Sequence, residues 1–581
     1  MMPDNSTEQG SLTDSAGLEK DRRLLIAARE KGRLATLGAF VRLSGPGWLQ
    51  SAITLGGGSL AGSLYLGVLA GFSLLWLQPL AMILGIVMLS AISYVALSTG
   101  ERPFRAINSH VNPVLGWGWA IATLMANLVW ALPQFALATA AVRQNLLPGL
   151  VGPEAMPDAA GKLVVCATIC LICVIVVWFY DTGSWGIKLF EAILKIMVGV
   201  VVVCFFGVVI RLSFAKEGLH WGTVLRGLVP DLGLLTSPAR TFAPFIAEVN
   251  LRFRQFWIDT IVGQQRDVMV TAVSAAVGIN MTFLLPYSML RRGWDRNFRG
   301  LAIFDLATGL FVPFMLATGC VVIASAAQFH TRPIGGVLAD SGEAVVSAEA
   351  PKNLIAGYKR LATARLKYEL GAEAFANLSE QEKAERIDAL PAADKKMAAM
   401  LVKRDAFNLA ASLSPLTGDI FAHYVFGIGV IGMGISSIII LMLVNGFVVC
   451  EMIGIPPKGR AHRLTALMPC IGVLGPFIWT GGKAQFWLAI PTSMFAMVLL
   501  PIAYFTFYLL MNQKSLLAGN MPRGGKRAAW NTLMAIAAGL AAFGSIWSLW
   551  SKLRWLGISL FVGFVVLALI VHIVRCARRH A

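Results

Sequence analysis

The stretch of sequence that decides the fold is GPGWLQSAITLGGGS, residues 45–59. It opens an apolar segment that runs to residue 70, longer than the ~20 residues a helix needs to cross a bilayer. Three successive glycines, Gly56 to Gly58, lie near its middle, and each costs a helix about 1 kcal/mol relative to alanine. In lipid, a helix is interrupted only where the freed backbone is buried in protein or lines a cavity. We therefore predict an unwound segment at mid-membrane; the alternative is an unbroken helix that packs closely through small residues.

The composition of the whole chain is that of a membrane protein. Of its 581 residues, 57% are hydrophobic and 14% are charged, whereas soluble proteins carry about 25% charged residues. This excludes a soluble enzyme, a disordered chain, a collagen-like fibre and a disulfide-rich secreted domain. No nucleotide-binding loop, catalytic triad or cluster of His, Cys and Asp appears in the sequence. We therefore expect no enzymatic activity and no cofactor.

Apolar segments predict an all-α membrane protein with about twelve transmembrane helices. The segments are approximately 45–70, 73–99, 114–141, 162–180, 186–210, 268–290, 301–327, 419–449, 464–481, 484–511, 528–549 and 555–575. They divide the chain into a cytoplasmic N-terminal tail (1–42), spans one to seven (43–327), a helical extracytoplasmic insertion (328–418), spans eight to ten (419–512), and spans eleven and twelve with a cytoplasmic C-terminal tail (513–581).

Basic residues in the short loops set the expected orientation, because Lys and Arg accumulate on the cytoplasmic side. With the N-terminus inside, the inner loops 100–113, 291–300, 450–463 and 512–527 hold thirteen Lys and Arg. The outer short loops hold five, which are Arg143, Lys162, Lys483, Lys552 and Arg554. We expect a multi-pass protein of a bacterial inner (plasma) membrane with both termini in the cytoplasm. The net charge of +18 is attributed to these loops, so no nucleic-acid partner is expected.

The insertion at 328–418 is nearly balanced in charge, with twelve Lys and Arg against eleven Asp and Glu. Segments 353–371 and 380–405 look helical, and Ser379 with Glu382 has the spacing of a capping box. We expect a small helical cap outside the membrane, whose charges form a solvated face rather than a binding site.

The sixth span carries a second interruption, in the sequence GINMTFLLPYS at residues 278–288. Gly278, Asn280 and Thr282 put flexible and polar groups at mid-membrane, and Pro286 removes a backbone donor. The alternative is a simple kink at the proline. Spans one and six are corresponding members of two five-helix halves, and paired breaks of this kind mark the substrate site of inverted-repeat transporters.

With these motifs the chain resembles the Nramp (natural resistance-associated macrophage protein) family of divalent metal transporters. The resemblance rests on Gly45-Pro46-Gly47, on Gly67, on GFSLLW at 71–76, on FGIGVIGMGISS at 426–437 and on Pro491. It implies a leucine-transporter-type fold of the APC superfamily, with two inverted five-helix repeats followed by two C-terminal helices. It also implies transport of a divalent metal cation by alternating access.

This sequence lacks several of the metal-binding and acidic residues of the family. The first-helix motif Asp-Pro-Gly-Asn corresponds here to Gly56-Gly57-Gly58-Ser59, so the metal-binding aspartate is missing. The sixth-helix motif Met-Pro-His corresponds to Thr282-Phe283-Leu284, and the family's carbonyl ligand to Ile279; a competing alignment puts the motif on Leu285-Pro286-Tyr287. The acidic residues of the family's third helix are absent from the matching stretch, which runs from Asn127 through Gln134 to Leu137.

The candidate substrate site is therefore built from neutral groups. It comprises Gly56, Gly57, Gly58, Ser59, Ile279, Asn280 and Thr282, with Ser59 and Thr282 as candidate metal ligands. Neutral oxygens suit a harder ion such as Mg²⁺, which keeps several of its waters. A polar pathway is assigned to Asn127, Gln134 and Asp305. The two amides cannot titrate, so the usual Nramp proton coupling is not expected.

Two other functions fit the same fold. The glycine triplet would let backbone N–H groups approach a carboxylate, which favours an organic solute such as an amino acid. The candidate site lacks the family's charged ligands, and the chain carries the inserted cap. Both features also fit a receptor of the same fold that transports nothing. For Asp305, anchoring at the membrane interface is favoured over a role in transport. The sequence leaves the oligomeric state open; the expected partners are a metal ion or small solute and the lipid bilayer.

Overall fold

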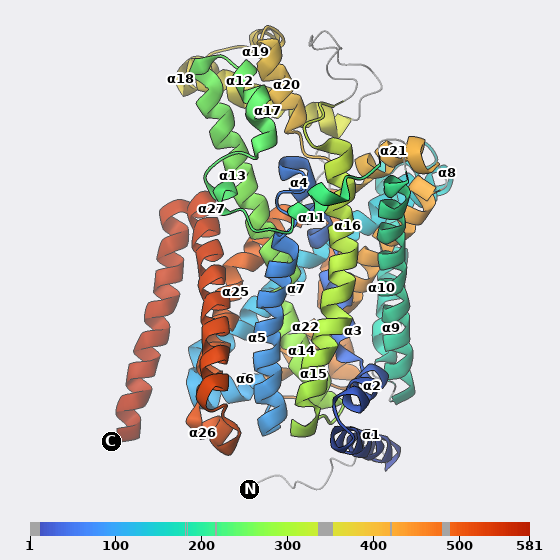
Figure 1. Ribbon diagram of the computed structural model, residues 1–581, viewed down its shortest axis with the longest axis vertical. Coiled ribbons are helices and arrows are strands. Elements are labelled where there is room, and N and C mark those ends of the chain that lie inside the picture. Colours follow the sequence, from blue (N-terminus) through green and yellow to red (C-terminus); the bar gives the residue numbers. More distant parts are fainter. Residues whose placement is uncertain are drawn as a thin grey trace.

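Long helices standing side by side form the body of the molecule, and a group of shorter helices covers one of its ends (Figure 1). The computed structural model describes residues 12–180, 182, 184–214, 218–334, 352–418, 421–478 and 489–580. Helix α1 (Leu12–Glu30) and the end of α27 (Gly524–His580) lie at the uncovered end, opposite α17 (Lys352–Leu370). Both ends of the described chain are therefore on one side of the molecule.

The first span is broken, as predicted. Helix α3 (Pro46–Thr54) begins at a proline, whose fixed φ suits the first helical turn. Helix α4 (Gly57–Ala70) follows after two residues, at an angle of 61°. The residues between them, Leu55 and Gly56, have non-helical backbone angles. The helix therefore unwinds at Leu55 and at the first glycine of the triplet, and the second and third glycines lie in the first turn of α4.

The sixth span is broken at a matching place. Helix α13 (Leu251–Ala276) ends and α14 (Ile279–Arg291) begins, separated by Val277 and Gly278 in extended conformation. Pro286 lies inside α14, two turns after the break, so the interruption is not a proline kink. The start of this span was predicted at 268, but α13 begins at Leu251. Its outer turns continue beyond the bundle and pack against the cap.

The remaining spans follow the predicted order. They are α5 (Leu77–Thr99), α7 (Pro113–Ala141), α9 (Asp158–Phe179), α10 (Ser184–Ser213), the pair α15 (Arg299–Leu306) and α16 (Val312–Phe329) joined by a π-helical turn η6 (Ala307–Phe311), α22 (Phe426–Ile453), the series α23 (Gly459–Ala466), η8 (Met468–Leu474) and α24 (Gly475–Ile478), and α25 (Ala489–Met511).

Within the described residues, ten helices are long and apolar enough to cross a membrane, or eleven when the bent first span is included. The last of them, α27, is counted once although it contains a reversal at Arg554, where φ is 51°. Figure 1 shows its two limbs running in opposite directions. The limbs correspond to the predicted spans eleven and twelve, and the all-helical membrane fold is confirmed for the part of the chain that the structure describes.

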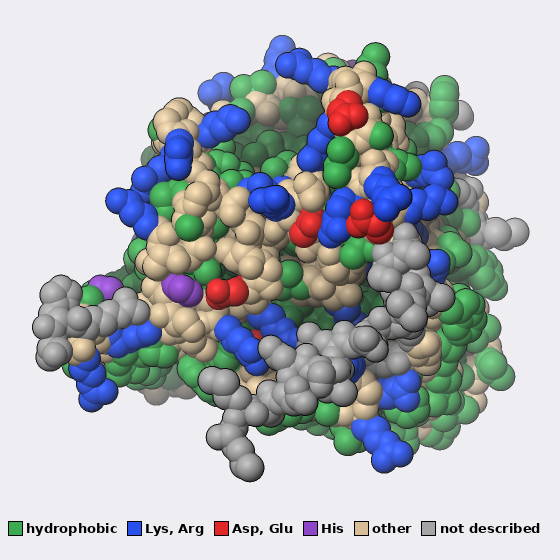
Figure 2. Space-filling model, turned by 90° about the horizontal axis from the view of Figure 1, so that it is seen from below, with side chains coloured by type: hydrophobic (Ala, Val, Ile, Leu, Met, Phe, Trp, Pro, Cys, Tyr) green, Lys and Arg blue, Asp and Glu red, His purple; other side chains and the backbone are tan. Residues whose placement is uncertain are grey.

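Short elements of the predicted inner loops lie at the same end as α1. They include α6 (Pro103–Ala106) and α26 (Lys514–Leu517). Seen from this end, Lys and Arg side chains spread across the surface and greatly outnumber Asp and Glu (Figure 2). Of the predicted outer basic residues, Lys483 lies outside the described residues.

The cap is helical, and its charges are partly internal. The predicted capping box of Ser379 and Glu382 is confirmed at the start of α19 (Glu380–Asp388). The predicted helix 380–405 is in fact two helices, because Pro391 starts α20 (Ala392–Met400). Arg365 is completely buried and pairs with Asp394 at 2.9 Å. This pair therefore belongs to the core of the cap rather than to a solvated face.

The cap also supports the outer turns of α13. Trp257 on α13 donates a hydrogen bond to the carboxylate of Asp394 at 2.7 Å. The guanidinium of Arg365 stacks over the ring of Phe253, 3.3 Å from its centroid. These contacts explain why the helix extends through a stretch whose sequence is too polar for a membrane span.

Gly67 fixes the closest approach between α4 and α16. A Cβ atom at Gly67 would lie 2.6 Å from the carbonyl oxygen of Val322 and 2.7 Å from the amide nitrogen of Ala326, and would also meet the hydroxyl of Ser325. Backbone atoms cannot move aside cheaply, so only glycine fits. By contrast, a Cβ at Gly319 on α16 would meet nothing within 4 Å.

We predict that Gly67→Ala lowers the free energy of unfolding by about 1–3 kcal/mol, because the methyl group overpacks the contact. Gly319→Ala is the matched control and should leave stability unchanged or raise it slightly. Thermal unfolding of the two variants in detergent measures the difference. Equal melting temperatures would show that the α4–α16 contact does not depend on glycine.

Candidate functional site

The ends of four half-helices meet inside the bundle, where α3 and α13 end and α4 and α14 begin. The hydroxyl of Thr54, the last residue of α3, lies 3.4 Å from the carbonyl oxygen of Ala276 and 3.1 Å from the sulfur of Met281. The two breaks are therefore adjacent in space. At this place, which we call the break site, both helix N-termini and both C-termini present backbone groups that have no partner within their own helix.

Helix α7 lines the break site with one polar face. Five buried residues recur on this face at helical spacing, namely Trp119, Thr123, Asn127, Trp130 and Gln134. At one end, the indole of Trp119 donates to the hydroxyl of Thr282 at 2.9 Å. At the other end, the amide oxygen of Gln134 accepts from the backbone N–H of Gly57 at 2.8 Å. One helix thus contacts both interrupted spans.

Asn127 lies between these two contacts, and its side chain is fully buried. Neither its amide nitrogen nor its amide oxygen has a hydrogen-bond partner within the described chain. The same holds for Gln50, which is fully buried on α3 one turn before Thr54. Buried amides without partners are rare in native proteins, because each costs about 1–3 kcal/mol. Two of them beside the break site indicate that this region is built to meet something polar.

Gln50 is the residue that sequence reasoning missed. It stands in the quoted stretch at a spacing of four from Thr54, so both share a helix face. That spacing was the available signal, since an amide on an otherwise apolar half-helix points to a polar environment.

The hydroxyls of Ser59 and Thr282, both proposed as metal ligands, are held in place by the backbone. Ser59 accepts from the N–H of Gly56 at 3.1 Å and lies 2.9 Å from its carbonyl oxygen. Thr282 donates to the carbonyl of Ile279 and accepts from Trp119. Asn280 accepts from the N–H of Met281 at 2.9 Å. A hydroxyl oxygen has two lone pairs, so those of Ser59 and Thr282 each retain one that is free to bind a cation.

Helix α22 closes the other side of the first break with two serines. Ser436 donates to the carbonyl of Ala52 at 2.9 Å, and Ser437 lies 3.4 Å from the carbonyls of Ala52 and Ile53. A Cβ atom at Gly56 would run into the hydroxyl of Ser437. A side chain at Gly56, the position that the sequence resemblance aligns with the family's aspartate, would therefore have to displace the Ser437 hydroxyl.

Asp305, assigned to a polar pathway, lies away from the break site. Its carboxylate accepts from the N–H groups of Gly45 and Gly47, at 3.0 and 2.5 Å, and from the hydroxyl of Ser44. These groups form the N-terminus of α3, whereas the break is at its C-terminus. Asp305 thus caps a helix, and its charge is stabilised by the positive end of the helix dipole.

Acidic ligands are scarce across the described part of the chain, where no group of three or more His, Cys, Asp or Glu could hold a metal ion. Glu191 on α10 is paired with Arg292. The break site therefore offers carbonyl, amide and hydroxyl oxygens, with no carboxylate among the contacts described above.

A column of aromatic rings closes the site toward the end that carries the termini. Trp119 stacks on Phe283 at 4.5 Å between centroids, and Phe283 stacks on Tyr287 at 4.4 Å. Tyr287 in turn faces Phe447 of α22 at 6.1 Å. Phe283 and Tyr287 belong to α14, Trp119 to α7 and Phe447 to α22, and all four are buried, so aromatic rings fill the bundle on this side of the break site.

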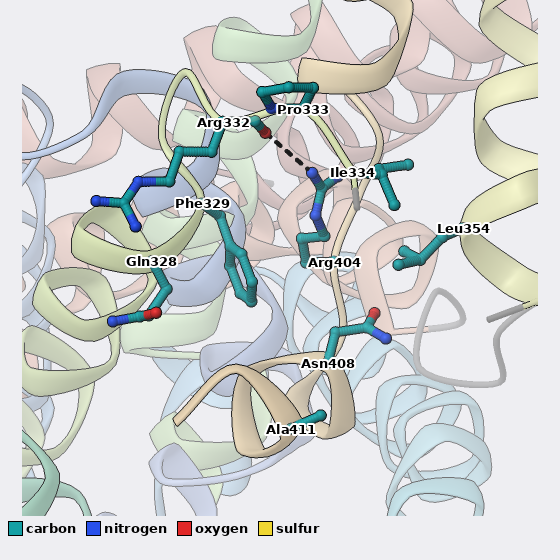
Figure 3. Close-up of a pocket in the computed structure, with 9 residues that line it drawn as sticks. All are labelled: Gln328, Phe329, Arg332, Pro333, Ile334, Leu354, Arg404, Asn408 and Ala411. Carbon is teal, nitrogen blue, oxygen red and sulfur yellow. Dashed lines mark hydrogen bonds between the residues drawn. The ribbon is translucent and has the colours of Figure 1, made fainter. Parts of the chain in front are cut away.

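A cavity of about 320 Å³ opens at the other end, below the cap (Figure 3). Arg332 and Arg404 line it, with Gln328 and Asn408 as its other polar residues. Arg404 donates to the carbonyl of Arg332 at 3.2 Å, and burial lowers the pKa of its guanidinium to about 10. Two arginines make this cavity unfavourable for a cation, so it is not the candidate substrate site.

The chain is similar to known proteins both in sequence and in fold. The profile of the Nramp family, described as natural resistance-associated macrophage protein-like, matches residues 47–349 and 392–551. The metal transporter Nramp2 of Oryza sativa subsp. japonica is 26% identical over 168 residues. That match covers 28% of this chain and 29% of the relative, so it spans under a third of that protein's length.

Among solved structures, a manganese transporter of Eremococcus coleocola is similar to this chain. In complex with an aromatic bis-isothiourea compound it gives a TM-score of 0.58 at 14% identity, covering 94% of this chain and 96% of that one. A mutant of the same transporter gives 0.59 with the same identity and coverage. At this identity the likeness concerns the fold, and it confirms the leucine-transporter-type architecture.

We predict that Asp305→Ala lowers the free energy of unfolding by about 1–3 kcal/mol, because the N–H groups at the start of α3 lose their acceptor inside the protein. Asp305→Asn keeps one amide oxygen and should lose less. Thermal unfolding measures both. Asp259→Ala, at an exposed position on α13, is the control. A wild-type melting temperature for Asp305→Ala would rule out the capping role.

Proposed function

This chain belongs to the Nramp family, and on that basis we propose that it is a secondary transporter that moves a divalent cation across the membrane by alternating access. Its helices are those of an integral, multi-pass membrane protein. The paired breaks support transport, since unwound backbone at mid-membrane is tolerated only beside a cavity or within protein. We assign the cytoplasmic side to the end that carries α1, in keeping with its many basic residues, and the location to a bacterial inner membrane (Figure 2).

The observation that carries the proposal is the pair of buried amides without partners, Asn127 and Gln50, beside the break site. A cation there would be met by amide, hydroxyl and carbonyl oxygens. Thr282, Ile279 and Ser59 supply the oxygens nearest the breaks, and Asn280 and the glycine triplet shape the approach. Because no carboxylate takes part, the cargo is a hard ion that keeps part of its water shell, and Mg²⁺ fits best.

Transport proceeds without the usual proton coupling. Along α7 the polar face is made of amide, hydroxyl and indole groups, none of which exchanges a proton near neutral pH. Asp305 is held by three donors at the start of α3. A proton path would need a titratable group between this cap and the break site, and the polar face of α7 provides none.

An amino-acid-like solute is the second candidate for the cargo. The converging N-termini of α4 and α14 favour it, because they attract a carboxylate. Two of the N–H groups needed are already engaged, however. Gly56 donates to Ser59 and Gly57 donates to Gln134. A carboxylate would have to displace both oxygens, so the cation is the preferred cargo. Thermal stabilisation by amino acids and not by metals would reverse this preference.

The first test is flux. We predict that proteoliposomes containing the protein take up Mg²⁺, followed by an internal Mg²⁺-sensitive dye, without internal acidification. Asn127→Leu should cut uptake about tenfold or more, because the cation loses an oxygen ligand. Asn377→Leu, at an exposed position in the cap, should not change it.

Absence of flux for Mg²⁺, Mn²⁺ and other divalent ions would refute transport and leave the receptor function. Uptake of a divalent ion together with acidification of the proteoliposome interior would support cation transport. It would refute the proposal that transport is not coupled to protons.

A second test addresses the lost aspartate. We predict that Gly56→Asp alone destabilises the protein, because its Cβ meets Ser437, and that adding Ser437→Gly restores stability. The double variant should bind Mn²⁺ about tenfold more tightly than wild type, since a carboxylate adds charge to the ligand set. Thermal unfolding and calorimetric titration measure the two effects. A fully stable single variant, or a double variant without gain in Mn²⁺ affinity, would contradict the arrangement described here.

A further inference from the structure

A basic cavity of about 410 Å³ lies at the terminus-bearing end of the bundle, between the end of α25 and the start of α27. Lys514, Arg523 and Arg527 line it, over the apolar side chains of Met521 and Pro522. Arg527 donates to the amide oxygen of Asn512 at 3.2 Å. Within the described residues, none of the three cations pairs with a carboxylate. The cavity therefore presents positive charge without a counter-ion from the chain.

The backbone around this cavity is strained. Ala518 lines it and has φ 41° and ψ −118°, in a region that side chains rarely adopt. Such strain costs about 1–3 kcal/mol and persists where the surroundings enforce it, often at binding sites. Gly524, also in the lining, has φ 56° and starts α27. The loop between α25 and α27 thus holds a strained conformation in which its residues form the wall of the cavity.

The cavity lies at the level of the membrane surface. Beside it, Tyr94 and Trp530 face each other at 6.3 Å, and the hydroxyl of Tyr94 donates to the carbonyl of Asn520 at 2.7 Å. Tyr and Trp with one apolar and one polar end mark the headgroup region of a bilayer. Along α27 from this level, four exposed apolar residues recur on one face, which are Leu533, Ile536, Leu540 and Phe543. These residues form an apolar face of α27 that runs from the cavity into the membrane.

We propose that this cavity binds the phosphate headgroup of an anionic phospholipid such as phosphatidylglycerol. Arg523 and Arg527 hold the phosphate oxygens, and Lys514 adds a third positive charge. The acyl chains lie along the apolar face of the first limb of α27. Basic pockets between transmembrane helices on the cytoplasmic side have the chemistry for anionic headgroups, whereas a neutral lipid offers them no net charge. The bound lipid joins the two C-terminal helices to the ten-helix transport core.

The test is native mass spectrometry of the delipidated, full-length protein titrated with phosphatidylglycerol or phosphatidylcholine. We expect one phosphatidylglycerol to bind in preference to phosphatidylcholine. Arg523→Gln with Arg527→Gln should weaken phosphatidylglycerol binding about tenfold or more. Arg523→Lys with Arg527→Lys should retain most of it, which separates loss of charge from misfolding.

The matched control changes two exposed cations in another inner loop, Lys458→Gln with Arg460→Gln, and should leave binding unchanged. Equal loss in this control would attribute the effect to general surface charge and overturn the site. Retention of lipid by the glutamine variant of Arg523 and Arg527 would overturn it as well. Inorganic phosphate alone, binding as tightly as the lipid, would make the cavity a site for free phosphate and refute the proposed lipid.

Discussion

The constraint on which this structure depends is that a backbone inside a membrane must find all its hydrogen-bond partners within the protein. Two helices are interrupted at mid-membrane, and the backbone N–H and C=O groups at the interruptions need hydrogen-bond partners there. Gln134 supplies an acceptor for Gly57, Ser59 supplies one for Gly56, and Ser436 supplies a donor for Ala52. Gln134 of α7 and Ser436 of α22 are thus required by the breaks, whatever solute passes between them.

The same packing determines what the site can hold. Ser437 occupies the space beside Gly56, so the first break presents a hydroxyl and carbonyl oxygens, with no carboxylate among its described contacts. Neutral oxygens compensate the charge of a cation only weakly, and a cation bound by them keeps more of its water. Asn127 and Gln50 offer amide groups that have no partner among the residues the structure describes. The cost of burying them is offset only when a polar cargo or water is present.

The sequence was sufficient for the span order, for both breaks and for the capping box at Ser379, because each rests on local chemistry: glycines that weaken a helix, a proline that starts one, a hydroxyl that caps one. It was insufficient where contacts between residues far apart in the sequence determine the local structure. The extension of α13 to Leu251 depends on Asp394 and Arg365 in the cap. The capping role of Asp305 depends on residues some 260 positions away. Gln50 was overlooked although its spacing of four from Thr54 places both on one helix face; that it is fully buried without a partner among the described residues follows from packing against distant segments.

The central claim is that a hydrated divalent cation binds between the two breaks through neutral oxygens. The most direct measurement is a structure of the protein in lipid nanodiscs, determined with and without Mg²⁺. The account predicts ion density between Gly56–Ser59 and Ile279–Thr282, within one water of the Asn127 amide. Density confined to other parts of the molecule, or an unchanged break site at saturating Mg²⁺, would contradict it.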